Sequence, residues 1–222
     1  MKFSVSKSED AIKDGGSGGL INTSGIYDCV INYVQVAETK NKAYQLNLNV
    51  TSGGMDQTIY GPILVNKDGS PNAITQNLLN RLCIIAGMDD GQELETESAE
   101  FAVGKEKKMM EMEIIPELSD ISVKMRVQME YSLWNNDVQE RKAIKAFYRE
   151  DGATAAEAES GENIGKRLAL DEEKYASNVT YRDGLTEEDI KTWVSSKSSG
   201  GSTGSSAAAA PKTTAKRPLF GK

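Results

Sequence analysis

The sequence has no histidine, and its 222 residues include only two cysteines and five prolines. Without histidine the chain lacks the commonest general base near neutral pH and a frequent metal ligand. Cys29 and Cys83 each lie within an apolar run, which favours buried free thiols over a metal site. The composition therefore predicts a protein that is not an enzyme and that has no catalytic residue, metal or cofactor.

Long hydrophobic runs are also absent. No segment is apolar over the length of a bilayer, and the first residues do not resemble a signal peptide, so we expect an intracellular protein with no membrane partner. The glycine-rich segment 15–19 lacks a preceding strand and a following lysine, which indicates a linker and not a phosphate-binding loop. Paired carboxylates such as Asp89 and Asp90 favour solvated surface over a magnesium site.

The net charge of −7 argues against a uniformly basic nucleic-acid-binding protein, but the charges are segregated along the chain. Acidic residues dominate positions 89–120 and 150–194, whereas basic residues dominate positions 121–149 and 195–222. Blocks of alternating sign indicate separate surfaces with separate roles.

Composition divides the chain into four regions. Residues 1–24 are polar and predict a flexible N-terminal arm, and residues 25–150 carry the strand-like patterns of one folded domain. Residues 151–194 predict an acidic, partly helical extension. Residues 195–222 predict a disordered basic tail, because a run of serine, glycine and alanine buries too little apolar surface to fold.

The clearest strand pattern runs from Ser122 to Leu133, where polar and apolar residues alternate without a break. A period of two is typical of a half-buried strand. A polar turn at 134–137 and a less regular run to Tyr148 complete a predicted hairpin. Similar patterns predict strands at 26–36, 44–50, 57–64 and 107–115 and helices at 72–86 and 186–194.

Three antiparallel strands, a helix and a further hairpin are the element order of the OB fold. We therefore predict a mainly β protein with one or two helices, built as an OB-fold-like antiparallel barrel with a flexible C-terminal tail. Such barrels bind oligonucleotides across strands two and three and through the loops that join strands one–two and four–five. In this chain those loops are residues 38–42 and 133–138.

Basic, amide and aromatic side chains gather on these predicted strands and loops. Cations neutralise phosphates and aromatic rings stack on bases, so the combination is typical of a surface for single-stranded nucleic acid. The candidate DNA-binding residues are Lys40, Lys42, Asn47, Tyr60, Lys124, Arg126, Trp134, Arg141, Lys142, Lys145 and Tyr148. The rings of Tyr60, Trp134 and Tyr148 are the stacking candidates, whereas Tyr44, Tyr131 and Phe147 are expected in the core. The alternative is a solvated sheet face whose charges serve only solubility.

Several short segments resemble a known family. They are Thr23–Asp28 (TSGIYD), Val36–Lys40 (VAETK), Gln45–Leu48 (QLNL), Leu78–Leu82 (LLNRL) and Ala86–Gly87. Over roughly residues 1–150 the chain is similar to the single-stranded DNA-binding proteins of tailed bacteriophages, closest to the Schitoviridae type. The resemblance implies an OB-fold protein that coats single-stranded DNA during phage replication and recombination in the cytoplasm of the infected bacterium.

The C-terminal tip departs from the acidic tail with which many single-stranded DNA-binding proteins recruit partners. Here Lys216, Arg217 and Lys222 surround the apolar pair Leu219 and Phe220. This cluster predicts a short motif for a replication or transcription protein; it could instead add non-specific DNA affinity or fold back on the acidic segment 150–194.

Two other functions stay open on the sequence alone. The runner-up is a non-enzymatic structural or adaptor protein of a phage complex, which docks through its acidic middle and basic tail. A nuclease is disfavoured because the chain shows no cluster of metal ligands with a general base.

Overall fold

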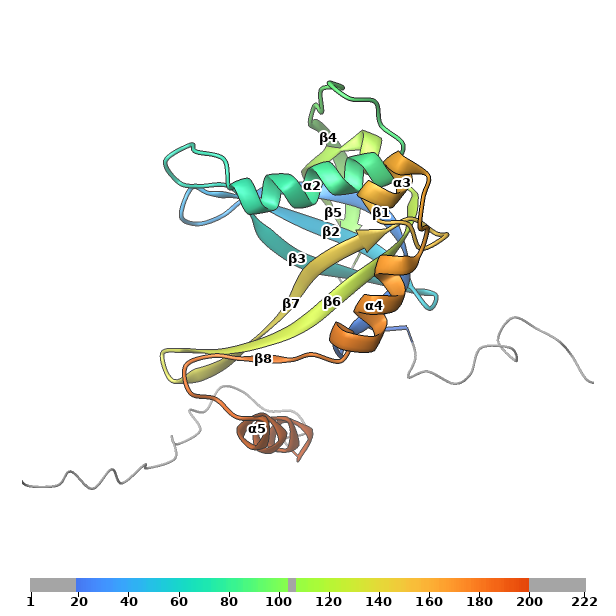
Figure 1. Ribbon diagram of the computed structural model, residues 1–222. Helices are drawn as coiled ribbons and strands as arrows, with labels where there is room; N and C mark the ends of the chain where they lie inside the picture. Colours follow the sequence, from blue (N-terminus) through green and yellow to red (C-terminus); the bar gives the residue numbers. More distant parts are fainter. Residues whose placement is uncertain (1–18, 104–106, 200–222) are drawn as a thin grey trace, which may run out of the picture. The chain divides into compact units, whose positions relative to one another are not determined.

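The computed structural model describes residues 19–103 and 107–199, which contain eight strands of one antiparallel sheet and four α-helices (Figure 1). The elements are β1 (Gly25–Glu38), β2 (Tyr44–Ser52), β3 (Met55–Val65), α2 (Ala73–Ile85), β4 (Glu97–Val103), β5 (Lys108–Ile115), the 3-10 helix η1 (Pro116–Leu118), β6 (Ile121–Trp134), β7 (Asp137–Tyr148), α3 (Ala155–Ser160), α4 (Lys166–Tyr175), β8 (Thr180–Tyr181) and α5 (Glu187–Ser199). The prediction of a mainly β protein is confirmed. The described residues hold four α-helices, however, so the prediction of one or two was wrong.

Contacts divide the chain into two compact units. The first holds the chain up to Glu130 together with Arg141–Thr180, and the second holds Tyr131–Glu140 with the chain from Tyr181 onward. The second unit therefore contains the tip of the β6–β7 hairpin and α5. None of the described helices is long and apolar enough to cross a membrane.

Polar and apolar side chains alternate along β6 and lie on opposite faces of the strand, as the sequence predicts. Val123, Met125 and Val127 point into the hydrophobic core of the first unit and are at most 3% exposed. The polar positions between them lie on the opposite face of the strand. The same core receives Leu79 and Leu82 from α2, whose first turn is capped by the Asn72 side chain.

The sheet remains open where an OB-type barrel would close. The second half of β1 pairs with β2 and its first half with β6, and the ladder continues from β2 to β3 and from β6 to β7. No ladder joins β3 to β7 within the described ranges, so the predicted barrel is corrected to an open antiparallel sheet. In this region Pro62 of β3 has no N–H to donate, and Leu79 and Leu82 of α2 line the same small pocket as Pro62 and Phe147 of β7.

One glycine sets the register between β2 and β3. A Cβ atom on Gly61 would lie 2.2 Å from the carbonyl oxygen of Leu46, closer than any side chain allows. The close approach coincides with a register shift between Gln45 and Asn47, and the Gln45 amide donates to the Gly61 carbonyl at 2.7 Å. Glycine at this position therefore fixes which β3 side chains face the solvent.

The acidic segment after β7 is part of the first unit as far as Thr180. Helix α3 begins with a capping box formed by Thr154 and Glu157, and α4 follows it. The sequence did not predict α4, because its ten residues follow a short loop and its mean hydropathy is low. The contacts of α4 with β6 and β7 determine which part of the sheet is accessible to solvent.

Candidate nucleic-acid interface

The structure places the predicted basic face of β6 and β7 against carboxylates of the same chain. The Lys124 ammonium lies 2.6 Å from the Asp28 carboxylate on β1, and the Lys145 ammonium lies 2.7 Å from Glu130 on β6. Glu130 is 7% exposed, so the second pair is largely shielded from water. These carboxylates offset the charge of both lysines, so a nucleic-acid phosphate meets less positive charge on this face than the sequence indicates.

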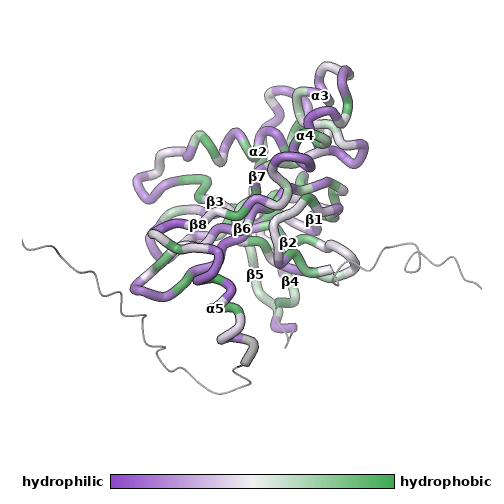
Figure 2. Tube along the Cα trace, turned by 60° about the horizontal axis from the view of Figure 1, so that its bottom comes forward, coloured by the Kyte–Doolittle hydropathy of each residue, from purple (hydrophilic) through white to green (hydrophobic). Residues whose placement is uncertain are grey.

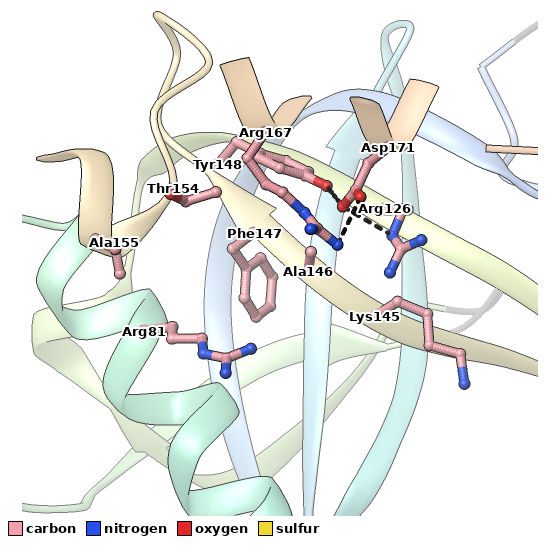
Figure 3. Close-up of a pocket in the computed structure, with 11 residues that line it drawn as sticks. Arg81, Arg126, Lys145, Ala146, Phe147, Tyr148, Thr154, Ala155, Arg167 and Asp171 are labelled. Carbon is pink, nitrogen blue, oxygen red and sulfur yellow. Dashed lines mark hydrogen bonds and ion pairs between the residues drawn. The ribbon is translucent and has the colours of Figure 1, made fainter. Parts of the chain in front are cut away.

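Helix α4 covers the same face through the buried carboxylate of Asp171, which is 2% exposed. This carboxylate accepts a hydrogen bond from the Tyr148 hydroxyl, and its oxygens lie 3.0 Å from an Arg167 nitrogen and 3.7 Å from Arg126 Nε (Figure 3). The Arg126 guanidinium also lies over the Tyr175 ring, 5.4 Å from its centroid. Together these contacts hold α4 against β6 and β7.

Two of the predicted DNA contacts are inaccessible. The Tyr148 side chain is fully buried, and burial together with its hydrogen bond to Asp171 raises the pKa of its phenol, so the prediction that its ring stacks on a base is wrong. Asn47 is 5% exposed and donates to the Gln35 amide at 3.2 Å, so it does not present its side chain to solvent as predicted. Strand alternation assigns a residue to a face but does not show what covers that face.

The remaining predicted basic contacts lie at the surface. Lys40 and Lys42 lie in the turn between β1 and β2, where Lys42 pairs with Glu38 at 3.1 Å. Arg141 is exposed on β7, and the neighbouring Lys142 is partly exposed. These positions are compatible with a role in binding, but the structure does not bring them together with Lys124 or Arg126 as free charges.

Trp134 ends β6 in the second unit and is 70% exposed, so its ring is accessible. In the same unit Tyr131 stacks on Tyr181, and Trp193 meets Tyr131 edge to face at 6.2 Å between ring centroids. The Trp193 ring also contacts the Lys197 ammonium at 3.5 Å. The predicted partner motif, Lys216, Arg217, Leu219, Phe220 and Lys222, lies outside the described residues.

A second surface of the sheet carries mainly amides and hydroxyls, together with the Asp56 carboxylate, which accepts a hydrogen bond from the Thr51 hydroxyl. It is the outer face of β1–β3, opposite the core side chains Leu48 and Val50. We call it the amide face and define it by the accessible side chains Asn32, Tyr33, Gln35, Asn49, Thr51, Thr58 and Tyr60, among which Asn47 is buried. Register pairs order it in rows, with Tyr33 opposite Asn49 and Thr58, and Gln35 opposite Asn47 and Tyr60.

Hydrogen bonds between side chains connect the strands of the amide face. The Asn32 amide donates to Asn49 at 2.7 Å and to Thr51 at 3.0 Å. The Asn49 amide in turn donates to Thr58 at 3.4 Å. A β-bulge between Ile31 and Tyr33 allows the adjacent residues Asn32 and Tyr33 to reach this surface together. The network holds amide groups in place while leaving several of them partly exposed.

Aromatic rings lie at two positions on this side of the sheet. The Tyr33 ring stacks on Phe101 of β4, with 4.0 Å between the centroids and 28° between the planes. Burial and, to a smaller extent, the Asp56 carboxylate raise the pKa of the Tyr33 phenol, so this ring stays neutral. Tyr60 on β3 is 67% exposed. Aromatic side chains of this kind provide surfaces on which unstacked bases can lie.

Three lysines lie at one end of the amide face, together with the carboxylates of Glu38 and Asp68. Because Tyr44 pairs with Val65, the turn before β2 and the loop after β3 leave the sheet at the same end. The turn carries Lys40 and Lys42, and the loop, which is hydrophilic in Figure 2, carries the exposed Lys67. Neither Lys40 nor Lys67 forms an ion pair within residues 19–103 and 107–199. Free ammonium groups thus lie in the turn and the loop at the end of the sheet where Tyr44 pairs with Val65.

The sequence pattern indicates only part of this surface. Lys40, Lys42, Asn47 and Tyr60 are among the residues predicted from the sequence, whereas Tyr33 and Phe101 are not. The bulge at Asn32 shifts the alternation of β1, so Tyr33 cannot be assigned to a face from periodicity. Phe101 belongs to a segment without a clear period, and its contact with Tyr33 spans a large sequence separation.

The described part of the chain has no cluster of three or more acidic or cysteine side chains that could hold a metal ion. Cys29 is buried, and burial raises the pKa of its thiol to about 11, which makes it a poor ligand and nucleophile at neutral pH. Comparison with known protein families and with curated proteins finds no match to this chain.

Proposed function

We propose that the chain binds single-stranded DNA with little sequence preference, in phage DNA replication and recombination as the sequence resemblance implies. The binding surface that we assign is the amide face with Phe101 and the lysines at its end. The single observation that carries the proposal is the open sheet face on which the Tyr33–Phe101 stack, the exposed Tyr60 ring and a row of uncharged amides occur together.

Physical chemistry supports a single strand over a duplex as the ligand. Unstacked bases can lie on aromatic rings, and every base has a face that stacks, so such contacts tolerate any sequence. Asparagine and glutamine amides both donate and accept hydrogen bonds, so Asn49 and Gln35 can match different base edges. A net charge of −7 further limits purely electrostatic binding, which leaves stacking as a major source of affinity.

The lysines at the end of the amide face and the paired Lys124 of β6 should affect the salt dependence of binding differently. Replacing Lys40 and Lys67 by alanine is expected to weaken binding of a (dT) oligonucleotide and to lower the slope of log K against log[salt] by about 0.7 for each phosphate that a lysine no longer neutralises. The matched control is the Lys124→Ala variant, whose lysine is paired with Asp28 and does not line the cavity described below. It should leave the slope nearly unchanged. A reduced slope in the control alone, measured by fluorescence anisotropy, would move the site to β6 and β7.

A further inference from the structure

A cavity of about 330 Å³ lies in the first unit between α2, α3, α4 and the strands β6 and β7 (Figure 3). Four basic side chains line it, Arg81 from α2, Arg126 from β6, Lys145 from β7 and Arg167 from α4. Asp171 is the one carboxylate in the wall among the described residues. The volume is at the lower end of the roughly 300–1,000 Å³ of small-ligand sites.

The wall keeps an excess of positive charge after its ion pairs are counted. Lys145 pairs with Glu130, and the Glu157 carboxylate at the rim accepts a hydrogen bond from the Arg167 backbone. Asp171 lies close to both Arg126 and Arg167. Arg81, by contrast, forms no ion pair with any residue that the structure describes. The four cations of the wall thus exceed the one carboxylate in the wall, Asp171, and the two outside it, Glu130 and Glu157.

The Arg126 guanidinium is incompletely satisfied. Its side chain is 15% exposed, and its buried Nε–H has no hydrogen-bond partner, because the Asp171 oxygen at 3.7 Å is too distant. Arginine has five N–H donors in a rigid fork, and because the Arg126 side chain lines the cavity, the cavity favours an anion with several oxygens. Asp171 contacts Arg126 and Arg167 from the buried side and thereby orients both guanidinium groups.

We propose that this cavity binds a phosphoryl group, held by Arg81, Arg126 and Arg167. Planar guanidinium groups match the oxygens of a phosphate in pairs, and a partly buried site strengthens each charge-assisted hydrogen bond. The phosphoryl group comes either from a free nucleotide or from the backbone of a bound DNA strand, since both present the same oxygens. The assignment does not depend on the amide face, which lies on other strands.

The test compares ligands and variants by isothermal titration calorimetry on the full chain. The probes are thymidine monophosphate, thymidine as its phosphate-free control, and a (dT) oligonucleotide. Arg81→Ala removes an exposed side chain, so folding should be retained, and Arg81→Lys keeps the charge without the fork. Lys166→Ala is the matched control, because Lys166 precedes Arg167 on the exposed side of α4 and does not line the cavity.

Either of two results supports the proposal and identifies the source. A free nucleotide as the source predicts that thymidine monophosphate binds, thymidine does not, and Arg81→Ala weakens binding about tenfold, with Arg81→Lys intermediate. If the phosphoryl group comes from a bound DNA strand, Arg81→Ala should lower only the affinity for the oligonucleotide. The proposal is overturned if neither ligand responds to Arg81→Ala, or if Lys166→Ala has the same effect, because the response is then one of net charge alone.

Discussion

A chain carrying Asp171→Ala is expected to lose about 3 kcal/mol of unfolding free energy in the first unit, because removing one partner of a buried ion pair costs roughly 3–5 kcal/mol. Asp171 is 2% exposed and contacts Arg126, Arg167 and the Tyr148 hydroxyl. Its removal leaves two cations and a buried hydroxyl without their partner. Urea unfolding followed by circular dichroism measures the loss, since both tryptophans lie in the second unit.

Three further variants separate the contributions to this cluster. Asp171→Asn keeps the size of the side chain and removes its charge, so it should fall between the wild-type chain and Asp171→Ala. Tyr148→Phe removes one hydrogen bond and should cost about 1 kcal/mol. Lys42→Ala breaks an exposed pair with Glu38 and should change stability by less than about 0.5 kcal/mol. If Asp171→Ala is no less stable than Lys42→Ala, the carboxylate does not hold α4 in place.

The double variant Tyr33→Ala, Tyr60→Ala is expected to weaken binding of single-stranded DNA by at least about 2 kcal/mol, or roughly thirtyfold. A base stacked on an aromatic ring contributes about 1–3 kcal/mol, and each substitution removes one ring from the amide face. Fluorescence anisotropy with a (dT) oligonucleotide of about 16 nucleotides covers the site size of one OB-like domain.

The matched control is Tyr44→Ala. Tyr44 is 43% exposed on β2, but it alternates with Leu46 and Leu48 and therefore belongs to the opposite face of the sheet. It should retain nearly full affinity. Thermal unfolding of each variant shows whether the fold survives, because removing the Tyr33–Phe101 stack alone costs about 0.5–1.5 kcal/mol. Equal affinity in Tyr33→Ala, Tyr60→Ala and the wild-type chain would remove the amide face from the site.

Most strands were predictable because their patterns are local. The period of two in β6 and the apolar stripe of α2 appear in the sequence and in the structure at nearly the same residues. The turn chemistry after Leu133 likewise predicts a hairpin, and β7 follows Asn135 and Asn136, which adopt positive φ. Local rules suffice wherever neighbouring residues decide the structure.

The sequence does not predict which residues pack against the outer face of β6 and β7, because these residues lie far apart in the sequence. Lys124 and Arg126 resemble free surface charges until Asp28 and Asp171 are known to lie beside them. The same holds for Tyr148, whose partner Asp171 lies on a helix that has no strong sequence signal. A basic strand therefore predicts a binding face only when no acidic segment of the chain folds over it.

Photo-crosslinking shows most directly which residues of the protein a bound DNA strand contacts. A (dT) oligonucleotide is bound to the full chain, irradiated, and the linked peptides are identified by mass spectrometry. We predict crosslinks at Tyr33, Tyr60 or Phe101, on β1, β3 and β4, and their disappearance when unlabelled oligonucleotide competes. Crosslinks confined to β6 and β7, or a chain that binds no single-stranded DNA, would contradict the assignment of the amide face.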